Sequence, residues 1–174
     1  MAEGEQVRFV DELRLGLHGR TRRVLAPRWV KVVQRVQVEY AWRYLLLAVA
    51  PLCGELRWAW LERMRQEHLR PVLEAWELPC VVWDGAPSHK GKQLTELETK
   101  RVALPAYSPE LNPAERVFEA LRARLEGRVY DSLSDKQAEA EAYVQELAAD
   151  PERVKQLCGW HWIIDALHGL PAAA

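Results

Sequence analysis

Three acidic side chains far apart in the chain carry the chemistry that the sequence indicates: Asp11, Asp84 and Glu115. Carboxylate oxygens are the ligands that Mg²⁺ and Mn²⁺ prefer. If the three meet, a pair at about 4 Å repels by roughly 4 kcal/mol at an effective dielectric near 20, so the group needs protons or a cation. Two divalent ions can activate an attacking hydroxyl and stabilise the leaving oxygen at phosphorus. These residue types therefore favour metal-dependent phosphodiester chemistry without a covalent nucleophile.

Asp11 lies in an alternating segment, residues 7–17, that predicts a strand. Its face of that strand also carries Val7, Phe9, Leu13, Leu15 and Leu17. An unpaired carboxylate on such an apolar face is costly, so something must compensate Asp11. The same alternation points Glu12 the opposite way and predicts that Glu12 is a surface residue. A strand-end aspartate bonded to backbone amides is the alternative explanation of Asp11.

Asp84 follows the short apolar segment Cys80–Trp83, which predicts a buried strand. The carboxyl ends of such strands are where open sheets with helical crossovers place their ligands. Asp84 also precedes Gly85, and an aspartate before glycine is a common turn dipeptide. A plain turn residue is therefore the alternative.

Glu115 lies in the first turn of a helix predicted over residues 113–126. Asn112 as the N-cap, Pro113 at the first helical position and Glu115 two residues later also make a capping box. At about 100° per residue, Glu115 falls on the border of the apolar stripe and can face the end of the sheet. Both the capping role and the catalytic role stay open.

Further elements must position these carboxylates. We predict strands over residues 38–50, 56–61, 80–83 and 101–104, and helices over 65–76, 92–97, 113–126, 135–149 and 152–167. Three strands followed by alternating helices and strands predict an antiparallel meander with right-handed crossovers. The expected fold class is α/β, with a mixed five-stranded sheet flanked by helices and with extra C-terminal helices.

Length and charge narrow the possible functions. A chain of 174 residues fits one domain, residues 1–174, with a proper core. The net charge of −1 argues against a protein that binds nucleic acid by being basic overall. Cations outnumber acids between Arg8 and Arg43, however, which is compatible with either a local phosphate-binding surface or a solvated face. Candidate DNA contacts there are Arg14, Arg22 and Arg23.

Redox and membrane chemistry are not indicated. The three cysteines have no paired spacing typical of zinc or redox sites, so we expect reduced thiols. The apolar run 44–53 is about half the length of a membrane span. The acidic N-terminus does not resemble a secretory signal. A cytoplasmic protein without a membrane segment is therefore expected.

Three ordered blocks resemble the transposase superfamily of bacterial IS630 and eukaryotic Tc1/mariner elements: VRFVDELRLGL, VVWDGAPSHKG and LPAYSPELNPAERVFEALR. The resemblance extends from about residue 7 to 127, and the later GWHWI is also similar. It implies a ribonuclease-H-like fold in which Asp11, Asp84 and Glu115 are catalytic and bind two Mg²⁺ or Mn²⁺ ions. It further implies hydrolysis that frees a 3′-hydroxyl, followed by attack of that hydroxyl on target DNA, usually at a TA dinucleotide.

The resemblance also implies partners. They are the transposon ends and the target DNA, with the enzyme acting as a dimer on DNA, and in bacteria it would associate with the nucleoid when bound. Because the chain starts almost at the first catalytic strand, we expect the N-terminal helix-turn-helix domain of such enzymes to be absent. Either a separate DNA-binding polypeptide, from a separate or frameshifted reading frame, supplies it, or the gene is a truncated remnant.

Two residue pairs have open roles. His89 and Lys90 occupy a stretch where relatives often have a histidine, and they can contact the scissile phosphate, contact a nearby carboxylate, or form an exposed loop pair. Trp58 and Trp60 can stack on unpaired bases, at about 1 to 3 kcal/mol per base, although core packing is favoured.

Two other functions compete with a transposase. The same fold and metals would serve a general ribonuclease-H-like nuclease or junction resolvase. An inactive transposase remnant could instead serve as a binding module, with its carboxylates retained as capping and turn residues.

Overall fold

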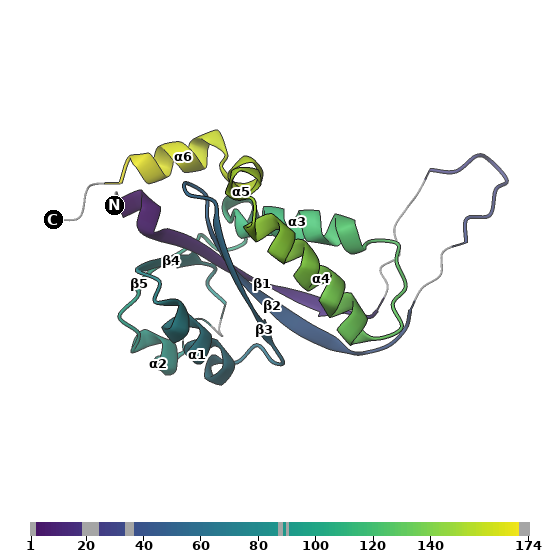
Figure 1. Cartoon of the computed structure of the whole chain (residues 1–174), viewed down its shortest axis with the longest axis horizontal. Helices are drawn as coiled ribbons and strands as arrows, with labels where there is room; N and C mark the ends of the chain where they lie inside the picture. Colours follow the sequence, from purple (N-terminus) through teal and green to yellow (C-terminus); the bar gives the residue numbers. More distant parts are fainter. Residues whose placement is uncertain (1–2, 19–24, 34–36, 87–88, 90, 171–174) are drawn as a thin grey trace.

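A mixed five-stranded sheet runs through the middle of the molecule in the order β3-β2-β1-β4-β5 (Figure 1). The strands are β1 (Val7–Gly16), β2 (Trp42–Ala50), β3 (Glu55–Leu61), β4 (Cys80–Trp83) and β5 (Lys100–Ala103). The first three form an antiparallel meander, and β4 and β5 continue the sheet in parallel with β1. This computed structural model describes residues 3–18, 25–33, 37–86, 89 and 91–170. The predicted mixed sheet is confirmed.

Helices cover both faces of this sheet (Figure 1). One face carries α1 (Gln66–Trp76) and α2 (Lys92–Thr95). The other carries α3 (Ala114–Leu125), α4 (Leu133–Ala148), α5 (Pro151–Cys158) and α6 (His161–His168). Short 3₁₀ turns, Glu3–Gln6 and Pro109–Leu111, precede β1 and α3.

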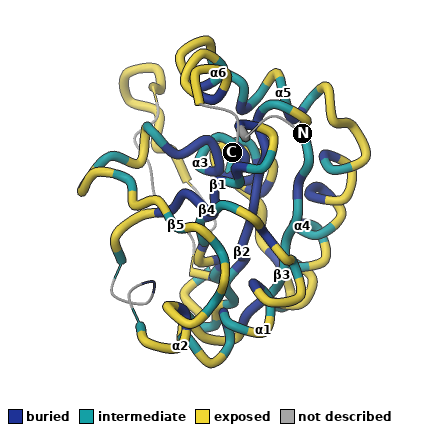
Figure 2. The backbone as a smooth tube through the Cα atoms, turned by 90° about the vertical axis from the view of Figure 1, so that its left-hand side faces the viewer, coloured by how far each residue is buried: buried dark blue, intermediate teal, exposed yellow. Residues whose placement is uncertain are grey.

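Alternation along β1 divides its side chains between two cores. Phe9 and Leu13 pack in the cluster that includes Phe118 of α3, whereas Val10 packs in the cluster that includes Leu69 of α1. The neighbouring strand β2 is buried along the whole run 45–50, as expected for a central strand covered on both sides (Figure 2). A carboxylate on either face of β1 is therefore close to a helical layer.

The second strand begins later than predicted, at Trp42 instead of Val38. Gly16, the last residue of β1, pairs with Trp42, and among the described residues no strand pairs with residues 37–41. Val38 and Tyr40 are consequently exposed. Alternation of residue types cannot reveal where the partner strand stops.

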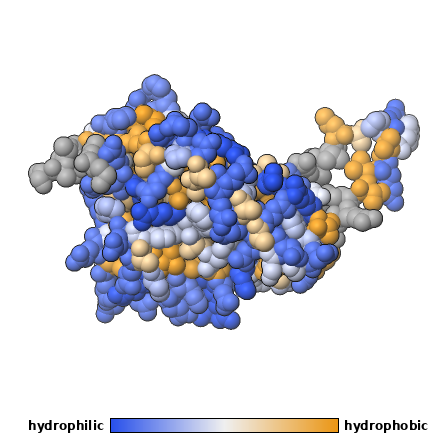
Figure 3. All heavy atoms as spheres, viewed as in Figure 1, coloured by the Kyte–Doolittle hydropathy of each residue, from blue (hydrophilic) through white to orange (hydrophobic). Residues whose placement is uncertain are grey.

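Residues 25–33 form an arm that stands away from the body of the molecule (Figure 1). Apolar side chains gather on this arm in the space-filling view (Figure 3). Leu25 and Trp29 have exposed fractions of 106% and 89%, and Val30, Val32 and Val33 are exposed as well. The guanidinium carbon of Arg28 lies 4.9 Å from the Trp29 ring centroid.

The C-terminal segment forms two helices where the sequence predicted one over residues 152–167. The first, α5, ends at Cys158, and the Gly159 N–H donates to the Lys155 carbonyl at 2.6 Å. A Cβ at Gly159 would lie only 2.6 Å from that carbonyl oxygen, so this close turn depends on glycine. The chain then restarts as α6 at His161.

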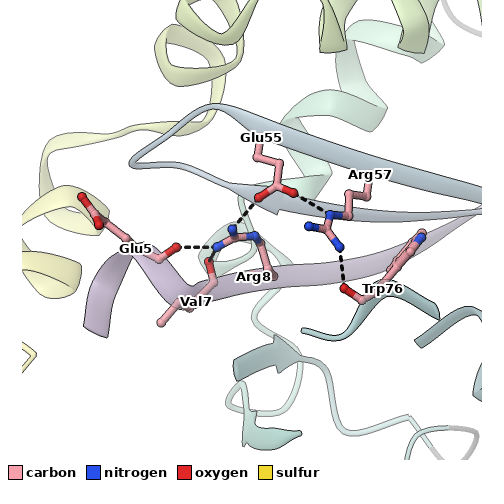
Figure 4. Close-up of polar contacts among 6 residues, drawn as sticks. All are labelled: Glu5, Val7, Arg8, Glu55, Arg57 and Trp76. Carbon is pink, nitrogen blue, oxygen red and sulfur yellow. Dashed lines mark hydrogen bonds and ion pairs between the residues drawn. The ribbon is translucent and has the colours of Figure 1, made fainter. Parts of the chain in front are cut away.

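An ion-pair network fastens the start of β1 to β3 (Figure 4). The Arg8 guanidinium donates to one oxygen of Glu55, and Arg57 Nε donates to the other at 2.5 Å. Arg57 also donates to the Trp76 carbonyl at the end of α1. Burial opposes ionisation of Glu55, but its bonds to the two arginines outweigh burial and lower its pKa. This network links the start of β1 to β3 and to the end of α1.

Within the described residues, no helix combines the length and the apolar character needed to cross a bilayer.

Candidate active site

Asp11 sits near the middle of β1 with both carboxylate oxygens in hydrogen bonds. Its Oδ1 accepts from the Glu12 N–H at 2.8 Å, and its Oδ2 accepts from Asn112 Nδ2 at 3.1 Å. Burial is the main cause that raises its pKa to about 7; the Glu12 N–H opposes the shift, and the negative charges of Glu12, Glu115 and Asp84 add to it. Asp11 is therefore a partly buried acid with other acids nearby.

The sheet register brings Asp84 level with Asp11. Phe9 of β1 pairs with Val82 of the parallel strand β4. Continued by two residues, this register sets Asp84 beside Asp11, and neighbouring strands lie about 4.8 Å apart. Because the chain leaves β4 after Trp83, Asp84 stands at the carboxyl edge of the sheet and is exposed. The strand-end position predicted for Asp84 is confirmed.

The carboxylate of Asp84 turns toward His89. Asp84 Oδ1 lies 2.7 Å from His89 Nδ1, and it also accepts from the Ala86 N–H at 3.0 Å. The other ring nitrogen, His89 Nε2, lies 3.3 Å from Glu12 Oε2. Burial disfavours the charged ring, but the nearby carboxylates of Glu12 and Asp84 outweigh it and raise the pKa of His89. The ring is thus held between two carboxylates.

Glu12 is not the surface residue that the strand alternation predicted. Its side chain is only 19% exposed, and its Oε2 is buried beside His89. The prediction was wrong because it assumed that one face of β1 is solvated, whereas His89 and the helices α1 and α2 cover that face.

Glu115 lies in the first turn of α3 and is partly buried. Its Oε2 accepts from Arg122 Nη1 at 3.2 Å, two turns further along the helix. The hydrogen bonds of the described residues do not include the reciprocal capping bond from Glu115 back to the Asn112 N–H, which instead donates to the Pro109 carbonyl. The capping-box explanation of Glu115 is therefore not the arrangement found.

Asn112 joins Asp11 to the start of α3. It is 2% exposed, and its Nδ2 donates to the Val10 carbonyl at 3.2 Å as well as to Asp11. Its Oδ1 accepts from the Ala114 N–H at 3.1 Å. Asn112 thus satisfies a helix donor, as predicted for a cap, although α3 begins at Ala114 and Pro113 occupies the cap position. Its link to β1 was not predicted, because side-chain contacts across 101 residues leave no local signal.

Each of the three carboxylates has its own donor: Asn112 for Asp11, His89 for Asp84 and Arg122 for Glu115. Within the described part of the chain, no three His, Cys, Asp or Glu side chains are grouped tightly enough to enclose a metal ion. Mutual repulsion of carboxylates accounts for this spread. The donor set nevertheless fits a cation, because the charge of a divalent ion would offset the repulsion between the partly buried Asp11 and its three acidic neighbours.

The predicted DNA contacts fall in different surroundings. Arg14 is exposed, with its guanidinium carbon 3.9 Å from the Trp42 ring centroid. His89 is 4% exposed and contacts carboxylates, which is one of the roles predicted for it, and the exposed-loop alternative is wrong for this residue. Arg22, Arg23 and Lys90 lie outside the described residues, so their roles stay predictions.

Trp58 and Trp60 serve the core. Both pack against the cluster that includes α3 and α4, and both indole N–H groups donate to the carboxylate of Glu141 on α4, Trp58 at 2.8 Å. The favoured prediction of core packing is confirmed. The shared acceptor on α4 gave no sequence signal, because it lies more than 80 residues from both tryptophans.

Comparison with known proteins gives a family match. The family described as DDE superfamily endonuclease matches residues 6–136, about three quarters of the chain and a range that contains Asp11, Asp84 and Glu115. Comparison with curated protein sequences gave no significant match.

Solved structures with a similar fold include the Mos1 mariner transposase. The chain is similar to the mariner Mos1 paired-end complex with Mg, at a TM-score of 0.65 and 16% identity over 93% of this chain and 52% of that one. It is similar to the Mos1 paired-end complex with Mn at a TM-score of 0.62 and 13% identity, covering 91% and 57% of the two chains. For the catalytic domain of Mos1 mariner transposase the TM-score is 0.52 at 16% identity, covering 90% and 82%.

These likenesses show a shared fold, and the ribonuclease-H-like prediction is confirmed. The chain spans little more than half the length of the Mos1 chains in the paired-end complexes. Together with the family match over residues 6–136, the shared fold confirms the resemblance that three sequence blocks indicated. The chain belongs to the DDE superfamily endonuclease family.

Proposed function

We propose that this chain is the catalytic domain of a DNA transposase, in which Asp11, Asp84 and Glu115 are the catalytic carboxylates and bind Mg²⁺ or Mn²⁺. The single observation that carries the proposal is the state of Asp11. It is partly buried in β1, and burial, with Glu115 and Asp84 adding to it, raises its pKa to about 7. Structural aspartates are seldom placed where other acids oppose their ionisation, whereas ligands of a divalent cation are.

The proposed reaction is in-line displacement at a phosphodiester. An oxygen of water, or of a DNA 3′-hydroxyl, attacks phosphorus while the bond to the leaving oxygen breaks. Divalent ions, when bound, would activate the attacking oxygen and stabilise the leaving one. The chain's own residues hold the carboxylates in place: Asn112 orients Asp11 from the end of α3, and Arg122 steadies Glu115.

The test uses DNA with the terminal inverted repeats that flank the gene. The purified chain is incubated with this DNA, a target plasmid and Mn²⁺, and both nicking and joining to the plasmid are scored on gels. Asp84→Asn and Glu115→Gln should abolish both products, because they remove ligand charge with little change in volume. Asp131→Asn, at an exposed position that follows α3, is the matched control and should leave both intact.

Three outcomes contradict the proposal. Nicking that persists in Asp84→Asn would show that another site cuts. Cleavage that ignores the repeats and yields no joined product would favour a general nuclease. Absence of both cleavage and Mn²⁺ binding would favour an inactive remnant.

We propose further that one DNA strand leaves the carboxylates along a cavity of about 650 Å³ at the end of β1 and β2. Arg122, the partner of Glu115, lines this cavity, which connects it to the carboxylate site. Its wall combines cations with aromatic rings, namely Arg14, Arg128, Lys136, Tyr40, Trp42 and Tyr130. Cations that track phosphates and rings on which bases stack are the features of single-strand binding surfaces.

Salt-dependent binding tests this path. Arg14→Ala should weaken binding of a single-stranded oligonucleotide and reduce the slope of log K against log salt by about 0.7, the loss of one phosphate contact. Arg63→Ala removes an exposed cation outside the cavity and is the control. Equal slopes for Arg14→Ala and the wild type would contradict the path.

We also propose that the enzyme acts as a dimer on DNA. The apolar arm of residues 25–33 supports this, because exposed apolar surface of this kind marks interaction sites. Light scattering after gel filtration, with and without repeat DNA, should show a dimer that Leu25→Glu with Trp29→Glu disrupts. A monomer on DNA in the wild type would contradict it.

A further inference from the structure

His89 and Glu12 form a buried polar pair directly behind Asp84. The two ring nitrogens of His89 face two carboxylates, Asp84 Oδ1 just after β4 at 2.7 Å and Glu12 Oε2 on β1 at 3.3 Å. His89 is 4% exposed, and the side chain of Glu12 is 19% exposed. The pair therefore links β1 to the segment after β4 beneath the carboxylate site.

The ring has little freedom to turn. It stacks on Trp83 with centroids 4.4 Å apart and an interplanar angle of 6°. The backbone N–H of His89 donates to the Ala86 carbonyl at 3.0 Å, and the backbone N–H of Ala86 donates to Asp84 Oδ1. These bonds tie the backbone of Ala86 both to His89 and to one carboxylate oxygen of Asp84.

We propose that Glu12 and His89 are positioning residues. Glu12 holds the His89 ring, and the ring fixes the Asp84 carboxylate so that Oδ1 is bound by His89 and Oδ2 is left to bind the cation. This inference rests on the proposed function. The hydrogen bonds that Asp84 accepts from described residues all go to Oδ1, which is consistent with a free role for Oδ2. Neither Glu12 nor His89 touches DNA or cation in this scheme.

Stability alone does not explain the pair. The same face of β1 and β4 is otherwise apolar, with Val10, Val81 and Trp83 buried there. Taking an acid and an imidazole out of water costs free energy, and well-packed apolar side chains of similar size are often as stable or more stable. Glu12 Oε2 and His89 Nε2 also lack a well-aligned hydrogen bond. A pair that is costly to bury and lies behind a proposed ligand is therefore best explained by control of that ligand.

Outer contacts of this kind orient metal ligands, and their loss usually lowers metal affinity 10- to 100-fold. Calorimetric titration with Mn²⁺ alone measures this directly. We expect His89→Ala to weaken Mn²⁺ binding by about 10-fold or more. His89→Gln, which keeps a side-chain N–H donor, should recover part of the affinity.

The double variant tests whether Glu12 acts through His89. Glu12→Gln introduced alone should weaken Mn²⁺ binding, but added to His89→Ala it should have little further effect. The reason is that substitutions of residues in contact have non-additive effects. His161→Ala is the matched control: His161 is in an exposed ion pair with Asp165 at 2.8 Å, and its loss should leave Mn²⁺ affinity unchanged.

Urea unfolding of the same variants separates positioning from support of the fold. If His89→Ala and Glu12→Gln lower stability while the folded proteins bind Mn²⁺ as the wild type does, the pair is structural and the inference is overturned. If the wild type itself takes up no Mn²⁺, the proposed function fails and the inference fails with it. If the wild type binds Mn²⁺ and both His89→Gln and His89→Ala bind it with the same affinity, the inference is overturned while the proposed function stands.

Discussion

Replacement of Asp11 by asparagine tests the electrostatics of the site. The ordinary pKa of an aspartate in an unfolded chain is about 3.9, and in the folded protein burial and acidic neighbours raise the pKa of Asp11 to about 7. Between about pH 4 and pH 7 the unfolded chain has therefore lost a proton that the folded chain keeps. The unfolded state binds fewer protons in this window, so the free energy of unfolding falls as pH rises and levels off above pH 7.

The magnitude follows from the same shift. One pKa unit corresponds to about 1.4 kcal/mol, so a shift of roughly three units costs the metal-free protein up to about 4 kcal/mol above pH 7, and about 2 to 3 kcal/mol of that cost develops between pH 5 and pH 8. Asp11→Asn removes the titration. It also sets an amide NH₂ against one of the two donors that Asp11 accepts from, which costs about 1 kcal/mol at either pH.

The comparison between two pH values cancels that constant cost. Without metal, the stability of Asp11→Asn relative to the wild type should rise by about 2 to 3 kcal/mol from pH 5 to pH 8. Urea denaturation followed by tryptophan fluorescence at both pH values measures it. Asp131→Asn, at an exposed position, should show no such change. Saturating Mn²⁺ should stabilise the wild type at pH 8 but not Asp11→Asn.

An equal difference between Asp11→Asn and the wild type at pH 5 and pH 8 would refute this reasoning. It would mean that Asp11 is already ionised in the folded protein at pH 5. The acidic neighbours would then lie too far away, or too well solvated, to disfavour its charge.

Three further tests of the frame around the site use urea denaturation. Asn112→Ala should lower the free energy of unfolding by about 2 to 3 kcal/mol, because it leaves a buried helix N–H and a buried carbonyl unpaired; a loss below about 0.5 kcal/mol would contradict the role given to it. Glu141→Gln should cost about 1 to 2 kcal/mol, because the amide can accept from only one of the two tryptophans of β3 without setting an NH₂ against the other; a neutral result would argue against the shared acceptor. Gly54→Ala should destabilise more than Gly127→Ala, because both glycines have positive φ but only at Gly54 would a Cβ meet a backbone oxygen, that of Pro151 at 2.1 Å. Equal losses at the two glycines would contradict the packing of the β2–β3 turn against α5.

Much of the fold was predictable because its signals are local. The alternation around Asp11, the short apolar strand before Asp84 and the turn residues before Glu115 each depend on neighbours in sequence. The strand β4 was predicted with the bounds found, and α1 and α3 within a residue or two. Predictions failed where an element's extent depends on a distant partner, as at the start of β2, or on a close backbone approach, as at Gly159.

The roles of Glu12 and Asn112 show where local reasoning stops. Alternation correctly assigned Glu12 to the face opposite Asp11, but it could not tell that a segment about 77 residues later would bury it beside His89. Asn112 looked like a helix cap, and it does accept a helix N–H, yet its other contact is with a strand 101 residues earlier.

The sequence by itself determined which carboxylates stand at the ends or on the faces of elements, and it determined the family through three ordered blocks. Only the tertiary structure decided what each carboxylate meets: Asn112 for Asp11, the His89 ring for Asp84, and Arg122 for Glu115. The physical reason is that residue type and spacing determine only local structure, through neighbours in the sequence. Burial, and with it the raised pKa of Asp11, arises only when strands and helices from the whole chain pack together.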